Sequence, residues 1–171
     1  PDRPIMPIAQ PQDDRRQQRR QQTSGEYGDL HHIVAGGAGF VPVSGDWNGD
    51  GVDTIGIYNP ATSTFFLRNT NSPGGADVVL SFGAGGAGYV PLVGDWDGNG
   101  SDTVGLYQPT SGAFFLRNSN TPGGADLVFT FGPPNAMPVV GDWDGSGTTT
   151  VGIFISSSST WFTPRICPRD E

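Results

Sequence analysis

The chain has 171 residues and a net charge of −8, with nine arginines, no lysine and seventeen acidic residues. Its length suits one ordinary domain, so a second independent fold is not expected. An acidic chain repels a phosphate backbone, and no apolar run is long enough to cross a bilayer, so we expect neither nucleic-acid binding nor a membrane span.

The N-terminal segment differs in composition from the rest of the chain. Residues 1–22 hold five arginines against three aspartates, a net charge of +2, which leaves −10 for residues 23–171. This predicts an extended Pro/Gln/Arg-rich tail over residues 1–29, either a solvated linker or a basic arm that contacts an anionic surface. The chain starts at Pro1 without a signal-peptide core; removal of a signal peptide during secretion and isolation as a fragment both explain this start.

Three near copies of one acidic turn, GDWNGDG, GDWDGNG and GDWDGSG, begin at Gly45, Gly94 and Gly141. They lie 49 and 47 residues apart, and the flanking residues match as well. A fixed period of this size indicates repeated units that bury their faces on one another. Each unit contains short runs rich in Val, Phe, Leu and Tyr between turn residues, with no helical period. We therefore predict an all-β domain over residues 30–163, built from three repeats of about 48 residues, each a four-stranded propeller-type blade.

The third repeat lacks its last strand. It ends after VGIFISSSSTWF (residues 151–162), which leaves residues 164–171 as a C-terminal tail, while residues 30–44 align with residues 79–93. The N-terminal region therefore supplies the missing strand, and the first and last strands should share one sheet, because an incomplete sheet exposes an unpaired edge. Three units are fewer than the roughly four to eight blades typical of propellers, so we expect strand donation between subunits, giving a homo-oligomeric ring or a helical filament.

The acidic turns carry oxygen donors at alternating positions, as calcium loops do. Each follows the order D-x-[DN]-x-[DNS]-G. The candidate donors are Asp46, Asn48 and Asp50; Asp95, Asp97 and Asn99; and Asp142, Asp144 and Ser146. The turns are not EF-hands, because the twelfth position is Ile57, Leu106 or Ile153 and strands flank the loop. The alternative is that these side chains cap their own turns without an ion.

The segment FGAGGAGYVPLVGDWDGNG (residues 82–100) resembles the FG-GAP or VCBS-type repeats of secreted bacterial proteins and the blades of integrin α-chain propellers. The resemblance covers about residues 30–163 and implies a secreted protein with calcium in the loop between the first two strands of each blade. The ligands that it implies are Asp46, Asn48, Asp50, Asp95, Asp97, Asn99, Asp142 and Asp144, with backbone carbonyls near Val52, Ser101 and Thr148. The chain departs from the family at the ninth loop position, which holds Thr54, Thr103 and Thr150 in place of Asp; Asp53 and Asp102 stand one residue earlier.

The remaining signals are weaker. Trp47, Trp96 and Trp143 share one loop position and predict a core between units in preference to a sugar platform. GAGGAG (residues 83–88) leads into a strand and so reads as a connector, not a dinucleotide site. The single cysteine, Cys167, excludes an intrachain disulfide.

No catalytic set stands apart from the repeats, so we do not expect an enzyme. The function predicted is a structural subunit of a secreted extracellular filament or surface assembly, stabilised by calcium. The alternative is a carbohydrate-binding or adhesion module that forms a closed ring and uses aromatic clefts between units to bind surface glycans.

Overall fold

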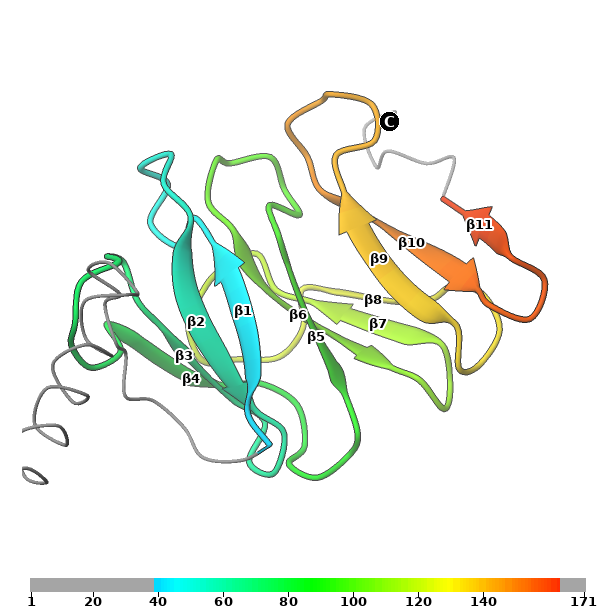
Figure 1. The fold of residues 1–171 in the computed structure, drawn as a ribbon, viewed down its shortest axis with the longest axis horizontal. Helices are drawn as coiled ribbons and strands as arrows, with labels where there is room; N and C mark the ends of the chain where they lie inside the picture. Colours follow the sequence, from blue (N-terminus) through cyan, green and yellow to red (C-terminus); the bar gives the residue numbers. More distant parts are fainter. Residues whose placement is uncertain (1–38, 164–171) are drawn as a thin grey trace, which may run out of the picture. The chain divides into compact units, whose positions relative to one another are not determined.

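The computed structural model describes residues 39–163, and every regular element in this range is a β-strand (Figure 1). The strands form three antiparallel sheets in chain order, named A, B and C here. Sheet A contains β1 (Val41–Gly45), β2 (Thr54–Asn59), β3 (Thr64–Leu67) and β4 (Val78–Ser81). Sheet B contains β5 (Val90–Gly94), β6 (Thr103–Gln108), β7 (Ala113–Leu116) and β8 (Leu127–Thr130). Sheet C contains β9 (Met137–Gly141), β10 (Thr150–Ile155) and β11 (Thr160–Phe162). The predicted all-β class is confirmed.

Each sheet is an up-and-down meander in which neighbours in the chain are neighbours in the sheet. The acidic turns join the first strand of each sheet to the second, as in β1 to β2. The turn before the third strand ends on a residue with a left-handed backbone: Ser63 (φ 52°), Gly112 (φ 69°) and Ser159 (φ 51°). The three turns share this geometry although only one of them uses glycine, the residue that adopts it without steric cost.

The core lies between successive sheets. We call the side of a sheet that contacts the next sheet its front face, and the opposite side its back face. Front-face residues of sheet A pack against back-face residues of sheet B in one buried cluster: Trp47, Tyr58, Phe65, Leu67, Leu80 and Phe82 with Val104 and Leu106. A second cluster joins sheets B and C in the same way: Leu92, Trp96, Tyr107, Phe114 and Leu116 with Ala136, Val151 and Ile153. Alternation along the strands separates the two faces.

Several sequence predictions lie outside the described residues. These are the tails at residues 1–29 and 164–171, the candidate donor strand that begins at Leu30, and Cys167. Between residues 39 and 163 there is no helix with the length and hydrophobicity needed to cross a bilayer.

Candidate functional site: acidic loops and uncovered sheet faces

The first aspartate of each acidic turn holds its own loop closed. One oxygen of the Asp46 carboxylate accepts hydrogen bonds from the amides of Gly49 (2.8 Å) and Asp50 (3.1 Å), and the other from the amide of Gly51 (2.7 Å). Asp95 accepts the three corresponding bonds in the second turn, at 2.7, 3.0 and 2.7 Å. The structure thus places these carboxylates inside their turns, where they cap backbone N–H groups.

Later donors in the loops also cap the backbone. The Asp50 carboxylate accepts a bond from the Val52 amide (2.9 Å), and the Asn99 side chain accepts one from Ser101 (2.8 Å). In the third turn, Asp142 accepts bonds from the amides of Ser146 (3.0 Å) and Gly147 (2.8 Å). The turn-capping alternative raised by the sequence therefore has direct geometric support in all three loops.

Capping leaves part of the acceptor capacity of the first aspartate unused in the first two loops. An ionised carboxylate offers about four lone-pair positions, and three N–H donors occupy three of those on Asp46. The remaining donors are also oxygens, which is the ligand type that calcium prefers. Only two acidic side chains of each loop lie among the alternating ligand positions, and residues 39–163 contain no group of three or more His, Cys, Asp or Glu residues arranged to hold a metal ion. A cation here would depend on amide, hydroxyl and backbone oxygens.

The eighth residue of the second loop and that of the third loop each form hydrogen bonds with the preceding sheet. The Asp102 amide donates to the Asp46 carbonyl (2.7 Å), and the Asp102 carboxylate accepts the Asp46 amide (2.9 Å). Between sheets B and C, the Thr149 amide donates to the Asp95 carbonyl (2.7 Å) and the Thr149 hydroxyl accepts the Asp95 amide (3.1 Å). We call this pair of hydrogen bonds the clasp. Sequence analysis noted the position of Asp102 but not this role.

The clasp needs a glycine at the end of the first strand of the preceding sheet. A Cβ atom placed on Gly45 would lie 2.9 Å from the Cβ of Asp102, and one placed on Gly94 would lie 2.7 Å from the Cβ of Thr149. Both distances are too short for real side chains. Glycine at these positions therefore allows the next sheet to approach the strand.

The carboxylate of the clasp residue Asp102 has a raised pKa. Burial raises the pKa of Asp102 above its usual value, and the neighbouring charges of Asp53, Asp46 and Asp95 raise it further, while the hydrogen bond from the Asp46 amide opposes the shift. Ionised Asp102 is thus held in a partly buried and acidic place. A neutral hydroxyl performs the same task at Thr149 without that cost.

The tryptophans of the acidic loops divide into two kinds. Trp47 and Trp96 are buried in the two inter-sheet clusters, as predicted for a core between units. Trp143 is 52% exposed, and its ring lies over the end of β9, 3.0 Å from the position that a Cβ on Gly141 would take. In sheets A and B the corresponding glycines, Gly45 and Gly94, are approached by the clasp residue of the next sheet. The indole of Trp143 therefore occupies the place that such a clasp residue would take on sheet C.

A pair of aromatic rings on the front face is buried in sheets A and B and partly exposed in sheet C. Tyr58 and Phe65 in sheet A (ring centroids 4.6 Å apart) are buried, and so are Tyr107 and Phe114 in sheet B (4.7 Å). The corresponding rings of sheet C, Phe154 and Trp161, keep the same spacing at 4.4 Å, yet Trp161 is 62% exposed. Within residues 39–163, the front face of sheet C therefore carries core-type residues without a sheet against it.

The back face of sheet A is open as well. Ile55 is 38% exposed, whereas its counterparts Val104 and Val151 are buried against the preceding sheet. The ring pair of Phe40 and Phe66 on this face (centroids 6.3 Å apart) corresponds to Tyr89 and Phe115 (5.9 Å), which pack in the cluster between sheets A and B.

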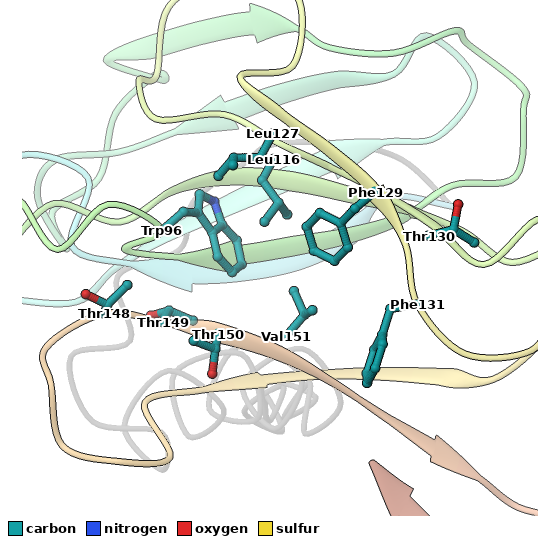
Figure 2. A pocket seen from close by; sticks show the side chains of 10 residues that line it. All are labelled: Trp96, Leu116, Leu127, Phe129, Thr130, Phe131, Thr148, Thr149, Thr150 and Val151. Atoms are coloured by element: carbon teal, nitrogen blue, oxygen red, sulfur yellow. The ribbon is translucent and has the colours of Figure 1, made fainter. Parts of the chain in front are cut away.

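A cavity of about 300 Å³ lies between sheets B and C (Figure 2). Trp96 and Phe129 lie on one wall, and Val151 lies on the opposite wall. The lining residues are Trp96, Leu116, Leu127, Phe129, Thr130, Phe131, Thr148, Thr149, Thr150 and Val151. The cavity is thus mostly apolar, with Thr130 on the side of sheet B and three threonines on the side of sheet C.

Sequence analysis missed two structural arginines. Arg117 is buried and donates to the carbonyls of Thr121 (2.8 Å) and Gly124, and it lies 3.7 Å from the Asp126 carboxylate. Arg68 holds the corresponding loop of sheet A in the same manner, 3.3 Å from the Asp77 carboxylate. The repeated FFLRN segments were the available signal, because a charged residue directly after a buried strand needs partners.

Comparison of the chain with protein-family models, with curated proteins and with solved structures finds no match. The likeness to FG-GAP or VCBS-type repeats therefore stays a prediction from the residues quoted above.

Proposed function

We propose that the protein is a structural subunit that joins with copies of itself into an extracellular filament or surface assembly. The observation that carries this proposal is the edge of sheet C. Strands β3 and β7 each pair on their outer side with a further strand, β4 and β8, whereas within residues 39–163 the corresponding strand β11 has no such neighbour. Unpaired edges are templates for strand addition.

The donor in this proposal is the segment from Leu30 onward of a neighbouring copy, which aligns with β4 and the connector that follows it. A donor strand from another copy makes a head-to-tail contact, because donor and acceptor surfaces differ. Such contacts form a ring when the rotation closes and a helical filament when it does not.

Calcium is the cation proposed for the acidic loops, with Asp46, Asp95 and Asp142 as central donors. Its role would be mechanical, because neutralising the carboxylates and fixing the loops stabilises the turns that carry the clasp. Extracellular sites of this type bind calcium with dissociation constants of roughly 10⁻⁴ to 10⁻³ M. Secretion is part of the same proposal, since such sites fill only at extracellular calcium concentrations.

The test is the molar mass of the intact chain by light scattering, beside a variant that lacks residues 1–34. The intact chain should form large species, and the truncated chain should remain small while keeping its β-sheet circular dichroism. A chain that begins at Gly25 keeps the candidate strand and loses the tail, so it separates the contributions of the two. Equal masses for the intact and the 1–34-deleted chains would contradict strand donation.

The cavity between sheets B and C supports a second candidate function, carbohydrate binding. Trp96, Phe129 and Phe131 line the cavity together with the threonines at 148–150, and aromatic rings and hydroxyls are side-chain groups that stack on and hydrogen-bond to sugars. Glycan-array binding that is lost in the Phe129→Ala variant would support this candidate. Binding that survives the substitution would exclude the cavity as the sugar site.

A further inference from the structure

We infer that the uncovered front face of sheet C docks on the back face of sheet A of a second copy of this chain, and that Asp53 of that copy clasps the Asp142 backbone. The inference rests on the proposed self-assembly and deepens it by naming the two surfaces and their register. It concerns described residues only and does not depend on which segment supplies the missing strand.

The first argument is that the chain contains this interface twice. Sheets A and B, and then sheets B and C, meet through a front face of paired aromatic rings and a back face of aliphatic residues. The same front pair, Phe154 and Trp161, is left over on sheet C, and the same aliphatic position, Ile55, is left over on sheet A. The two leftover surfaces are therefore the two halves of a third interface of the same kind.

The second argument is the clasp. Asp102 and Thr149 stand at the eighth position of their loops and bind the backbone at the first position of the preceding loop. Asp53 holds the eighth position in the first loop, where its side chain is exposed. Asp142 holds the first position of the third loop, so its backbone amide and carbonyl correspond to the clasped groups of Asp46 and Asp95. An Asp53 carboxylate accepting the Asp142 amide would complete the series.

The third argument is the glycine that precedes each clasp. Gly45 and Gly94 lack a side chain because the next sheet comes within about 3 Å of the place that a Cβ would take. Gly141 stands at the corresponding position at the end of β9, and the three atoms nearest to the place of its Cβ all belong to the ring of Trp143. Docking requires Trp143 to move off Gly141 and into the interface, where Trp47 and Trp96 lie in their own sheets. Its fluorescence therefore reports on docking.

A second copy fits these surfaces better than an unrelated partner, because both halves and their polar register occur in one chain. Front and back faces differ, so the contact is head-to-tail and leaves one free face of each kind at the ends of any open assembly. In sheets A and B, β4 leads through residues 82–89 into the sheet that covers its front face. A donated strand followed by β1 would bring sheet A of the donor to the front face of sheet C in the same way.

The test compares substitutions at the two faces by sedimentation velocity of the full chain. Asp53→Arg and Trp161→Ser should weaken association at least tenfold. Asp53→Thr, which keeps a hydroxyl acceptor like that of Thr149, and Val128→Ser, which alters an exposed residue on β8, should stay within about threefold of the intact chain. Arginine at position 53 also reduces the net negative charge, so weaker association could not be assigned to charge repulsion.

A cross-linking measurement gives an independent readout. In chains that carry Cys167→Ser, Asp53→Cys is introduced in one preparation and Gly141→Cys in another. The two positions should form a mixed disulfide once the sheets separate locally by about 1 Å, because the corresponding Cβ positions lie 2.7–2.9 Å apart in the internal interfaces and a disulfide holds its Cβ atoms about 3.5–4.5 Å apart. The mixed pair should outnumber either homodimer, and the Trp143 emission should shift to the blue on mixing.

The outcomes separate the inference from the proposed function. Suppose that the intact chain and Asp53→Arg assemble equally well, and that the two cysteine preparations form no mixed disulfide. The proposed docking surfaces are then wrong, and the proposal of self-assembly stands. If Trp161→Ser weakens association but Asp53→Arg does not, the clasp register is wrong. If the intact chain remains a monomer at every concentration, both proposals are contradicted.

Discussion

Replacing Trp96 with alanine should destabilise the chain by about 3 kcal/mol. Burying an aromatic side chain removes roughly 150–250 Å² from water, worth about 4–6 kcal/mol at about 25 cal/mol per Å². Trp96 is 4% exposed, so nearly all of that is lost. Its indole N–H is buried without an acceptor among the described residues, and removing such a group relieves about 1–3 kcal/mol.

Trp143 provides the matched control, because it has the same loop position but is half exposed. By the same area rule, Trp143→Ala should cost about 2 kcal/mol, because roughly half of the Trp143 surface is already in water. The assay is urea unfolding followed by circular dichroism, at concentrations where both variants are monomeric. A loss of about 3 kcal/mol corresponds to a fall in melting temperature of roughly 10 °C for a domain of this size. Equal losses for the two variants would refute the assignment of the inter-sheet clusters as the core.

Three further predictions follow from the loops. Because burial and nearby carboxylates raise the folded-state pKa of Asp102, its ionised form costs stability at neutral pH, and that cost disappears as the pH falls through the raised pKa. Asp102→Asn keeps an acceptor for the clasp and should flatten this part of the melting-temperature profile between pH 3.5 and 8; profiles parallel to the unsubstituted chain would contradict the assignment. Calcium at 10 mM should stabilise the fold by about 1.4 kcal/mol for each site with a dissociation constant near 1 mM, and Asp95→Asn should reduce the gain; identical calorimetric melting with calcium and with EDTA would show that the turns bind no ion. Arg117→Lys should lower the free energy of unfolding in urea by about 1.5–3 kcal/mol, since an ammonium cannot reach all of the acceptors that the guanidinium binds. Arg68→Lys should cause a similar loss. A loss under about 0.5 kcal/mol would show that these arginines do not stabilise the fold.

The sheets could be predicted from the sequence because their signals are local. Short β-branched and aromatic runs alternate with turn residues, and the acidic turn marks the junction of the first two strands in each repeat. The hairpin turn before β7, at residues 109–112, is likewise visible as PTSG. Such features depend on neighbours a few residues away.

The contacts between sheets could not be predicted in the same way. Asp102 accepts a hydrogen bond from an amide 56 residues earlier, and that pairing exists only once two sheets are packed. The exposure of Trp143 is a property of its surroundings, since Trp47 and Trp96 stand at the same loop position and are buried. The repeat predicted three equal tryptophans, whereas the structure of residues 39–163 leaves Trp143 half exposed because no following sheet packs against it there.

The central claim is head-to-tail self-assembly, and electron microscopy of the intact chain in calcium tests it most directly. The account predicts filaments or closed rings in which sheet C of each subunit meets sheet A of the next, with Trp143 and Asp53 in the contact and a fourth strand beside β11. Particles of single-chain size at every concentration, or twofold dimers that pair sheet C with sheet C, would contradict it.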